Sequence, residues 1–163
     1  MIHILQIKIK LKNADPRIWR KVLVPDFYTF LDLHLVIQIT MGWENYHLFD
    51  FNVNKVRIGQ PFDEEWDRDM EVASTLTLAE VFEGEKTAFK YEYDFGDGWA
   101  HELKIEKYLE SDPTLTYPKC IGGEMACPPE DCGGIWGYYQ MLDIIQAKRH
   151  PEKKEMLEWL GGK

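Results

Sequence analysis

Five side chains in this sequence have the chemistry of metal ligands. Three cysteines lie in the segment 120–132, and His47 and His101 occupy strand-like segments elsewhere. Zn²⁺ prefers a tetrahedron of Cys, His or carboxylate ligands. We therefore expect a zinc site from His47, His101, Cys120 and Cys132. The Cys-x6-Cys-x4-Cys spacing lacks the short Cys-x2-Cys knuckle of typical zinc modules, so buried, inert thiols remain the alternative.

The same segment also fits a nucleophilic site. Cys132 precedes Gly133 and the start of an expected helix, where amide dipoles favour a thiolate. His101 or His47 would then act as the base, and Asp131 or Glu130 would orient it. In the alternative reading, Asp131 only caps the helix, and each histidine is a hydrogen-bonded imidazole of the core.

Alternating polarity predicts the strands that must position these residues. Apolar and polar residues alternate over 5–12, and strand character resumes over 17–24 after the turn at Pro16, which predicts a hairpin. A second alternating strand covers 47–53. The clearest signal is 88–107, where two alternating runs flank Gly96-Asp97-Gly98. A three-residue loop there would place Phe95 opposite Trp99 and Tyr93 opposite His101.

Helices are expected between and after these strands. Thr29 and Asp32 form a capping box before an apolar run that Gly42 ends. Periodic apolar residues predict further helices over 135–147 and 152–160, and a short one over 77–82. Residues 54–73 and 111–133 are expected to be a polar excursion and a long loop. We predict an α+β fold: one domain over 1–163, with a mostly antiparallel sheet covered by about three helices.

Composition limits the class of protein. The chain has 163 residues, 45% of them hydrophobic, which suits one domain with a real core. It has no apolar run long enough to span a bilayer, no signal-peptide pattern and an odd number of cysteines. We therefore expect a cytoplasmic protein with no membrane partner.

The net charge of −9 makes nucleic acid an unexpected partner, without excluding it. Residues 1–24 carry six basic residues and one acidic residue, while 60–112 carry sixteen acidic and five basic ones. Arg17, Trp19 and Lys21 would share one strand face and form a small basic, aromatic patch. The alternative is a tryptophan packed beneath basic side chains.

Several longer motifs carry a family resemblance. They are Pro16–Lys21, Leu33-His34 with Ile37-Gln38, Met41–Trp43 with His47-Leu48, Tyr91–Asp97 with Trp99 and His101, and Pro128–Gly134. Taken together, they resemble the plasmid pRiA ORF-three-like family, and the likeness spans roughly residues 2–146. The resemblance implies an α+β fold and brings no established activity.

These observations leave three hypotheses for function. The first is a cytoplasmic metal- or ligand-binding module built on the His/Cys cluster. The second is a Cys- or metal-dependent hydrolase that uses Cys132, His101 and Asp131. The third is an accessory protein of nucleic acids or mobile elements that binds through the basic residues of 8–21.

Overall fold

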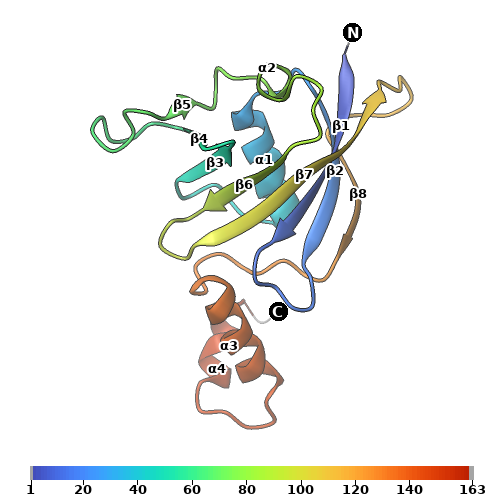
Figure 1. Ribbon diagram of the computed structural model, residues 1–163. Coiled ribbons are helices and arrows are strands. Elements are labelled where there is room, and N and C mark those ends of the chain that lie inside the picture. The colour runs from blue at the N-terminus through green and yellow to red at the C-terminus, as the bar shows by residue number, and fades with distance from the viewer. Residues whose placement is uncertain (1, 162–163) are drawn as a thin grey trace.

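One curved, eight-stranded sheet forms the frame of the molecule in the computed structural model, which describes residues 2–161 (Figure 1). The strand order is β5-β4-β3-β6-β7-β1-β2-β8, and only the β4–β5 pair is parallel. The strands are β1 His3–Leu11, β2 Trp19–Pro25, β3 Phe49–Val53, β4 Val56–Gly59, β5 Glu71–Val72, β6 Ala88–Tyr93, β7 Trp99–Glu110 and β8 Lys119–Glu124.

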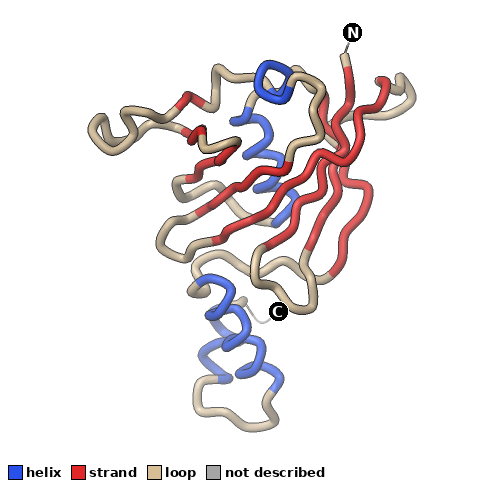
Figure 2. Tube along the Cα trace, viewed as in Figure 1, coloured by secondary structure: helices blue, strands red, loops and turns tan. Residues whose placement is uncertain are grey.

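Four helices complete the fold: α1 Phe30–Met41, α2 Leu78–Phe82, α3 Gly134–Gln146 and α4 Lys153–Trp159. The α+β class and the mostly antiparallel sheet are thus confirmed. Only part of the helical cover is as expected. Helix α1 lies against the sheet, whereas α3 and α4 pack together beyond one end of it (Figure 2). Within residues 2–161, no helix is long and apolar enough to cross a membrane.

Alternation in β1 explains how the sheet buries one face. Leu5, Ile7, Ile9 and Leu11 are almost fully buried and belong to the cluster that packs around α1. Lys8 and Lys10 point to the opposite, more exposed face. Because only this face of β1 packs against the core, the register of β1 against β2 and β7 is fixed. A slip of one residue would turn the apolar side chains of β1 toward solvent.

Helix α1 begins and ends as the sequence predicts. The Thr29 hydroxyl accepts a hydrogen bond from the Asp32 amide at 3.1 Å, and the Asp32 carboxylate accepts one from the Thr29 amide at 2.9 Å. At the other end, Gly42 adopts φ 77°, a left-handed conformation that glycine tolerates best. The capping box and the glycine stop are therefore confirmed.

The register predicted for the 88–107 hairpin is wrong by two residues. Tyr93 pairs with Trp99, and Tyr91 pairs with His101. The chain leaves the strand at Asp94, whose φ is 58° and whose Oδ1 accepts hydrogen bonds from the Gly96 and Asp97 amides. The connection therefore has five residues, and Phe95 lies on the surface instead of in the ladder.

Two regions expected to be irregular contain short strands. The 54–73 excursion holds β4 and β5, and the 111–133 loop holds β8, which pairs with β2. Strand β8 gives little signal because nearly all its side chains are exposed and two are glycines. Its pairing with β2 supplies the order that its own sequence does not predict.

A closed ring of hydrogen-bonded polar groups, buried except at Asn45, joins α1 to the sheet. His34 Nδ1 lies 2.7 Å from the Tyr91 hydroxyl, and His34 Nε2 lies 2.7 Å from Asn45 Oδ1. Gln38 donates its amide N–H to the same hydroxyl and accepts from the Asn45 backbone. Because Asn45 Oδ1 can only accept, His34 is neutral with its proton on Nε2, and every member of the ring is satisfied.

His101 is the second buried histidine, and its surroundings are aromatic. Its ring packs against Trp43 and Tyr91, with centroid distances of 5.5 and 5.3 Å. Neither ring nitrogen makes a well-formed hydrogen bond within the described chain. Burial lowers the pKa of both His34 and His101 from 6.5 to about 4. Both imidazoles are therefore neutral at physiological pH.

These two histidines should make the protein acid-sensitive. The unfolded chain takes up protons near pH 6.5, whereas the folded protein resists them until about pH 4. The free energy of unfolding is therefore unaffected by these two groups above pH 6.5. Between pH 6.5 and about pH 4 it falls by up to about 3 kcal/mol per histidine, and below pH 4 it falls no further on their account. Urea unfolding of wild type and His101→Phe across this range measures the effect. The variant should lose less stability, and parallel curves would contradict the assignment.

Candidate functional site

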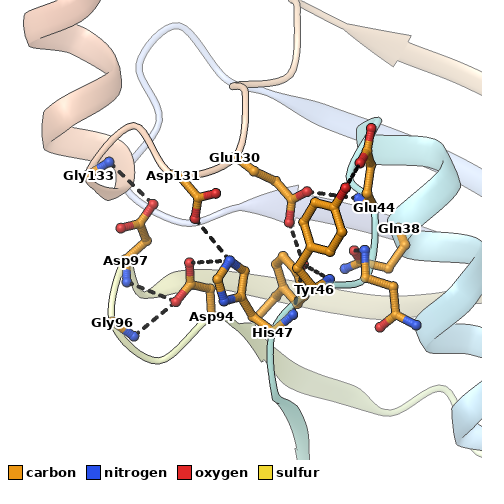
Figure 3. Close-up of polar contacts among 12 residues, drawn as sticks. Gln38, Glu44, Tyr46, His47, Asp94, Gly96, Asp97, Glu130, Asp131 and Gly133 are labelled. Atoms are coloured by element: carbon orange, nitrogen blue, oxygen red, sulfur yellow. Dashed lines mark hydrogen bonds and ion pairs between the residues drawn. The ribbon is translucent and has the colours of Figure 1, made fainter. Parts of the chain in front are cut away.

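Three ligand-type atoms from distant parts of the chain converge at one end of the sheet (Figure 3). His47 Nε2 lies 2.9 Å from Asp131 Oδ1 and 3.4 Å from Asp94 Oδ2. All three donor atoms lie within 4.8 Å of one another. His47 comes from the α1–β3 loop, Asp94 from the β6–β7 turn and Asp131 from the loop before α3. No other group of three such residues was found in the described chain.

Tyr93 fixes the loop that carries His47. Its hydroxyl accepts the backbone N–H groups of Tyr46, at 2.9 Å, and of His47, at 3.3 Å, and donates to Glu130. Burial and the neighbouring Glu130 carboxylate raise the pKa of the Tyr93 hydroxyl well above its usual value. The phenol therefore stays protonated and holds the 43–48 and 128–133 loops together.

The Asp94 carboxylate has one oxygen held and one directed at His47. Oδ1 accepts from the Gly96 amide at 3.1 Å and from the Asp97 amide at 3.3 Å. Oδ2 is the oxygen that faces His47 Nε2. The side chain is mostly buried, so its orientation is set by the hairpin turn and does not depend on solvent.

Asp131 is held by the loop around it. Trp43 donates its indole N–H to the Pro128 carbonyl at 2.8 Å, and the Glu44 amide donates to Glu130 at 2.9 Å. Asp131 has φ 60°, which turns its side chain toward His47. The first residue before α3 is Gly133, which provides no side-chain cap, so Asp131 does not cap the helix.

A close backbone contact joins the hairpin turn to the start of α3. The Gly133 amide donates to Asp97 Oδ2 at 3.3 Å. Gly134 has φ 75°, and a Cβ at this position would lie 2.2 Å from the Asp97 carbonyl oxygen. Only glycine fits there, so the Asp94 turn and the Asp131 loop have a fixed relative position.

The four residues of the predicted zinc site do not come together. His101 is enclosed in the core, and Cys120 is exposed on the edge strand β8. His47 instead meets Asp131, which the sequence had singled out as an orienting carboxylate. Asp94 was the missed member, because the alternation over 89–95 puts it with Lys90 and Glu92 on the polar face of the predicted strand. The signal that could have found it is Gly96 two residues later, the pattern of an Asx turn.

The thiols are poorly suited to nucleophilic chemistry. Burial and the nearby Asp97 carboxylate raise the pKa of Cys132 to about 12, the opposite of what an attacking thiolate needs. Cys127 Sγ lies 3.0 Å from an Arg20 guanidinium nitrogen and 3.4 Å from the Met41 sulfur. Burial raises its pKa as well. Cys127 and Cys132 therefore act as packing groups, whereas Cys120 is exposed on β8.

The basic patch around Trp19 is partly neutralised. Lys8 and Lys21 lie over the Trp19 ring, with ammonium-to-centroid distances of 5.0 and 5.7 Å. Lys21 also pairs with Glu106 of β7 at 3.3 Å. The tryptophan is therefore covered by basic side chains, and Glu106 offsets the charge of Lys21.

Comparison with known proteins places the chain in a family. The family model described as "Plasmid pRiA4b ORF-3-like protein" matches residues 3–163. The chain belongs to this family. It is 38% identical over 159 residues to the uncharacterised protein y4hQ of Sinorhizobium fredii, covering 97% of this chain and 81% of that protein.

A solved structure shares the fold. It is the crystal structure of MM3350, a protein of unknown function from Methanosarcina mazei Go1, with a TM-score of 0.89 and 35% identity. The match covers 99% of this chain and 91% of that one. Membership in the pRiA4b ORF-3-like family confirms the fold class, and the relatives' descriptions add no activity. The motifs that carried the resemblance supply His47, Asp94 and Asp131.

Two glycines of this region allow a matched test of the close contact. Gly98 and Gly134 both have positive φ, but a Cβ on Gly98 would meet no atom within 4 Å. Gly98→Ala should therefore cost only backbone strain, about 1 kcal/mol. Gly134→Ala adds the clash with Asp97 and should cost at least about twice as much in urea unfolding. Equal losses for the two variants would show that the contact relaxes easily.

Proposed function

We propose that the protein is a divalent-metal-binding module in which His47, Asp94 and Asp131 are the ligands. The observation that carries the proposal is the convergence of one imidazole nitrogen and two carboxylate oxygens from three separate loops. The loops that carry His47 and Asp131 are held by hydrogen bonds to other parts of the chain, and Asp94 Oδ1 is held by two amides of its own turn, as the outer contacts of a metal site would require. This replaces the His/Cys set expected from the sequence with a His/Asp set.

The spacing of the donor atoms supports a common ion. Ligand atoms about 2.1 Å from one metal, at tetrahedral or octahedral angles, lie roughly 3.0 to 3.4 Å apart. The His47–Asp131 and His47–Asp94 distances are 2.9 and 3.4 Å. A single Nε2 proton can satisfy only one of the two carboxylates well. A dication at the same point would neutralise both.

The donor set also indicates which metals would suit the site. One imidazole and two carboxylates match Zn²⁺, Mn²⁺ and similar divalent ions better than soft ions such as Cu⁺, which prefer sulfur ligands. Three protein ligands leave at least one coordination position for water or a ligand. His47 is partly exposed and Asp131 is exposed, so that position would face solvent.

Metal-dependent hydrolysis is the second candidate function. An open position on a metal held by three protein ligands is the arrangement that activates water in hydrolytic zinc sites. The raised pKa of Cys132 argues against the cysteine-dependent version.

The other expectations from the sequence receive unequal support. The ion pair between Lys21 and Glu106 reduces the positive charge available for binding nucleic acid. Three free cysteines suit a reducing compartment, which supports a cytoplasmic location.

The proposal predicts which variants lose metal. Isothermal titration calorimetry of tag-free protein with Zn²⁺ or Mn²⁺ should give about one binding site per chain. His47→Ala, Asp94→Asn and Asp131→Asn should each weaken binding at least about tenfold, because each removes a ligand.

Matched variants separate this site from the one expected from sequence. Cys120→Ser and Cys132→Ser should leave the affinity unchanged, and so should His101→Phe. Loss of metal in those variants, with no effect of Asp94→Asn, would favour the His/Cys set. No binding of either metal by the wild-type protein would refute the metal proposal altogether.

A further inference from the structure

The segment between β4 and β5 projects from the side of the sheet (Figure 1). It carries two aromatic side chains that are exposed to solvent. Phe62 is 80% exposed and Trp66 is 83% exposed. Large exposed aromatic residues that lie together are typical of contact surfaces, because the hydration of their apolar surface is unfavourable until a partner covers them. The pair therefore calls for a reason beyond the stability of the isolated chain.

Polar contacts hold this segment in one shape. Asp67 accepts hydrogen bonds from the Phe62 and Asp63 amides and from the Arg57 guanidinium, at 2.8 to 2.9 Å. Asp63 in turn accepts from the Glu65 and Trp66 amides. The aromatic side chains are thus presented by a folded loop, and a partner would pay little entropy to order it.

The two aromatics border a small hollow beside the candidate metal site. The hollow has a volume of about 200 Å³, close to that of one large side chain, and Leu48 and Phe95 also line it. These residues directly follow His47 and Asp94, and the Asp94 amide donates to the Leu48 carbonyl at 2.9 Å. Gln60 also lines the hollow, and its Oε1 atom is buried with no hydrogen-bond partner in the described chain.

The charge around the hollow selects the kind of partner. Residues 60–72 carry six acidic side chains and a single basic one, Arg68. The one cation that lines the hollow, Arg57, is already engaged by Asp50 and Asp67 at 2.8 Å. An incoming group that is positively charged and apolar along its length would match both the acids and the aromatic walls.

We propose that Phe62, Trp66, Phe95 and Leu48 form a docking surface for a basic, apolar peptide segment of a protein partner. An Arg or Lys side chain of that segment enters the hollow. The aliphatic part of this side chain packs on the aromatic rings. Its N–H groups donate hydrogen bonds to Gln60 Oε1 and the Asp63 carboxylate. The proposal goes beyond metal binding and does not rest on it, because none of these four side chains is a proposed ligand.

A peptide selection tests the proposal. A random twelve-residue phage library is selected on the wild-type protein, and the winning peptides are measured by fluorescence anisotropy. We expect the winners to be enriched in Arg or Lys next to aliphatic or aromatic residues. Trp66→Ser and Phe62→Ser should each weaken them at least about tenfold. Both residues are exposed, so the fold should tolerate the changes.

Trp136→Ser, at a 73% exposed tryptophan on α3, is the matched control and should bind like wild type. Binding should also be unchanged in EDTA and in Asp131→Asn, which separates this surface from the metal site. Winners that are acidic or neutral, winners insensitive to Trp66→Ser, or no enrichment at all would each overturn the proposal. Binding to phosphatidylcholine vesicles without peptide binding would point to a lipid surface instead and overturn it too.

Discussion

Two neighbouring tyrosine hydroxyls on β6 hold together the end of the molecule where the candidate site lies. Tyr91 closes the hydrogen-bonded ring that joins the buried His34 and Gln38 to Asn45. Tyr93 binds the next two backbone amides of the same loop and the Glu130 carboxylate. A buried network of this kind is stabilising only when every member is satisfied, so each group restricts the others. The loop that carries His47 has little freedom as a result.

This constraint explains why a histidine and two carboxylates can stay so close. Like-charged Asp94 and Asp131 repel, and one imidazole offers only one Nε2 proton between them. Asp94 stays in place because two amides of its own turn hold it, and Asp131 stays because its loop is held by Trp43 and Glu44. Rigid placement of groups that would otherwise separate is what a ligand-binding site requires.

The sequence predicts local features well where one residue type decides the outcome. The Thr29 capping box, the Gly42 helix stop and the alternating strand β1 all appear as expected, because each depends on neighbours in the chain. The hairpin register fails because Asp94 forms an Asx turn and leaves the ladder early. Strand β8 is missed because its order comes from β2.

The site was only half predictable for the same reason. His47 and Asp131 attract notice by residue type, but their meeting depends on tertiary contacts between segments far apart in the chain. Alternation predicted His47 and His101 alike as strand residues beside a metal site. In the structure, His47 lies in a loop beside carboxylates, and His101 lies among the aromatic rings of the core. Residue type suggested the chemistry, and long-range packing decided which residues share it.

The fit of Gly134 against Asp97 couples two parts of the chain in a thermodynamic sense. Helix α3 begins at that contact, and Asp131 lies just before it, while His47 and Asp94 lie in connections between elements of the sheet side of the molecule. Any solute that bridges Asp131 to the other two would also fasten the C-terminal helices to the sheet. By linkage, a change that loosens those helices weakens that solute's affinity, and saturation with it protects them from unfolding or proteolysis.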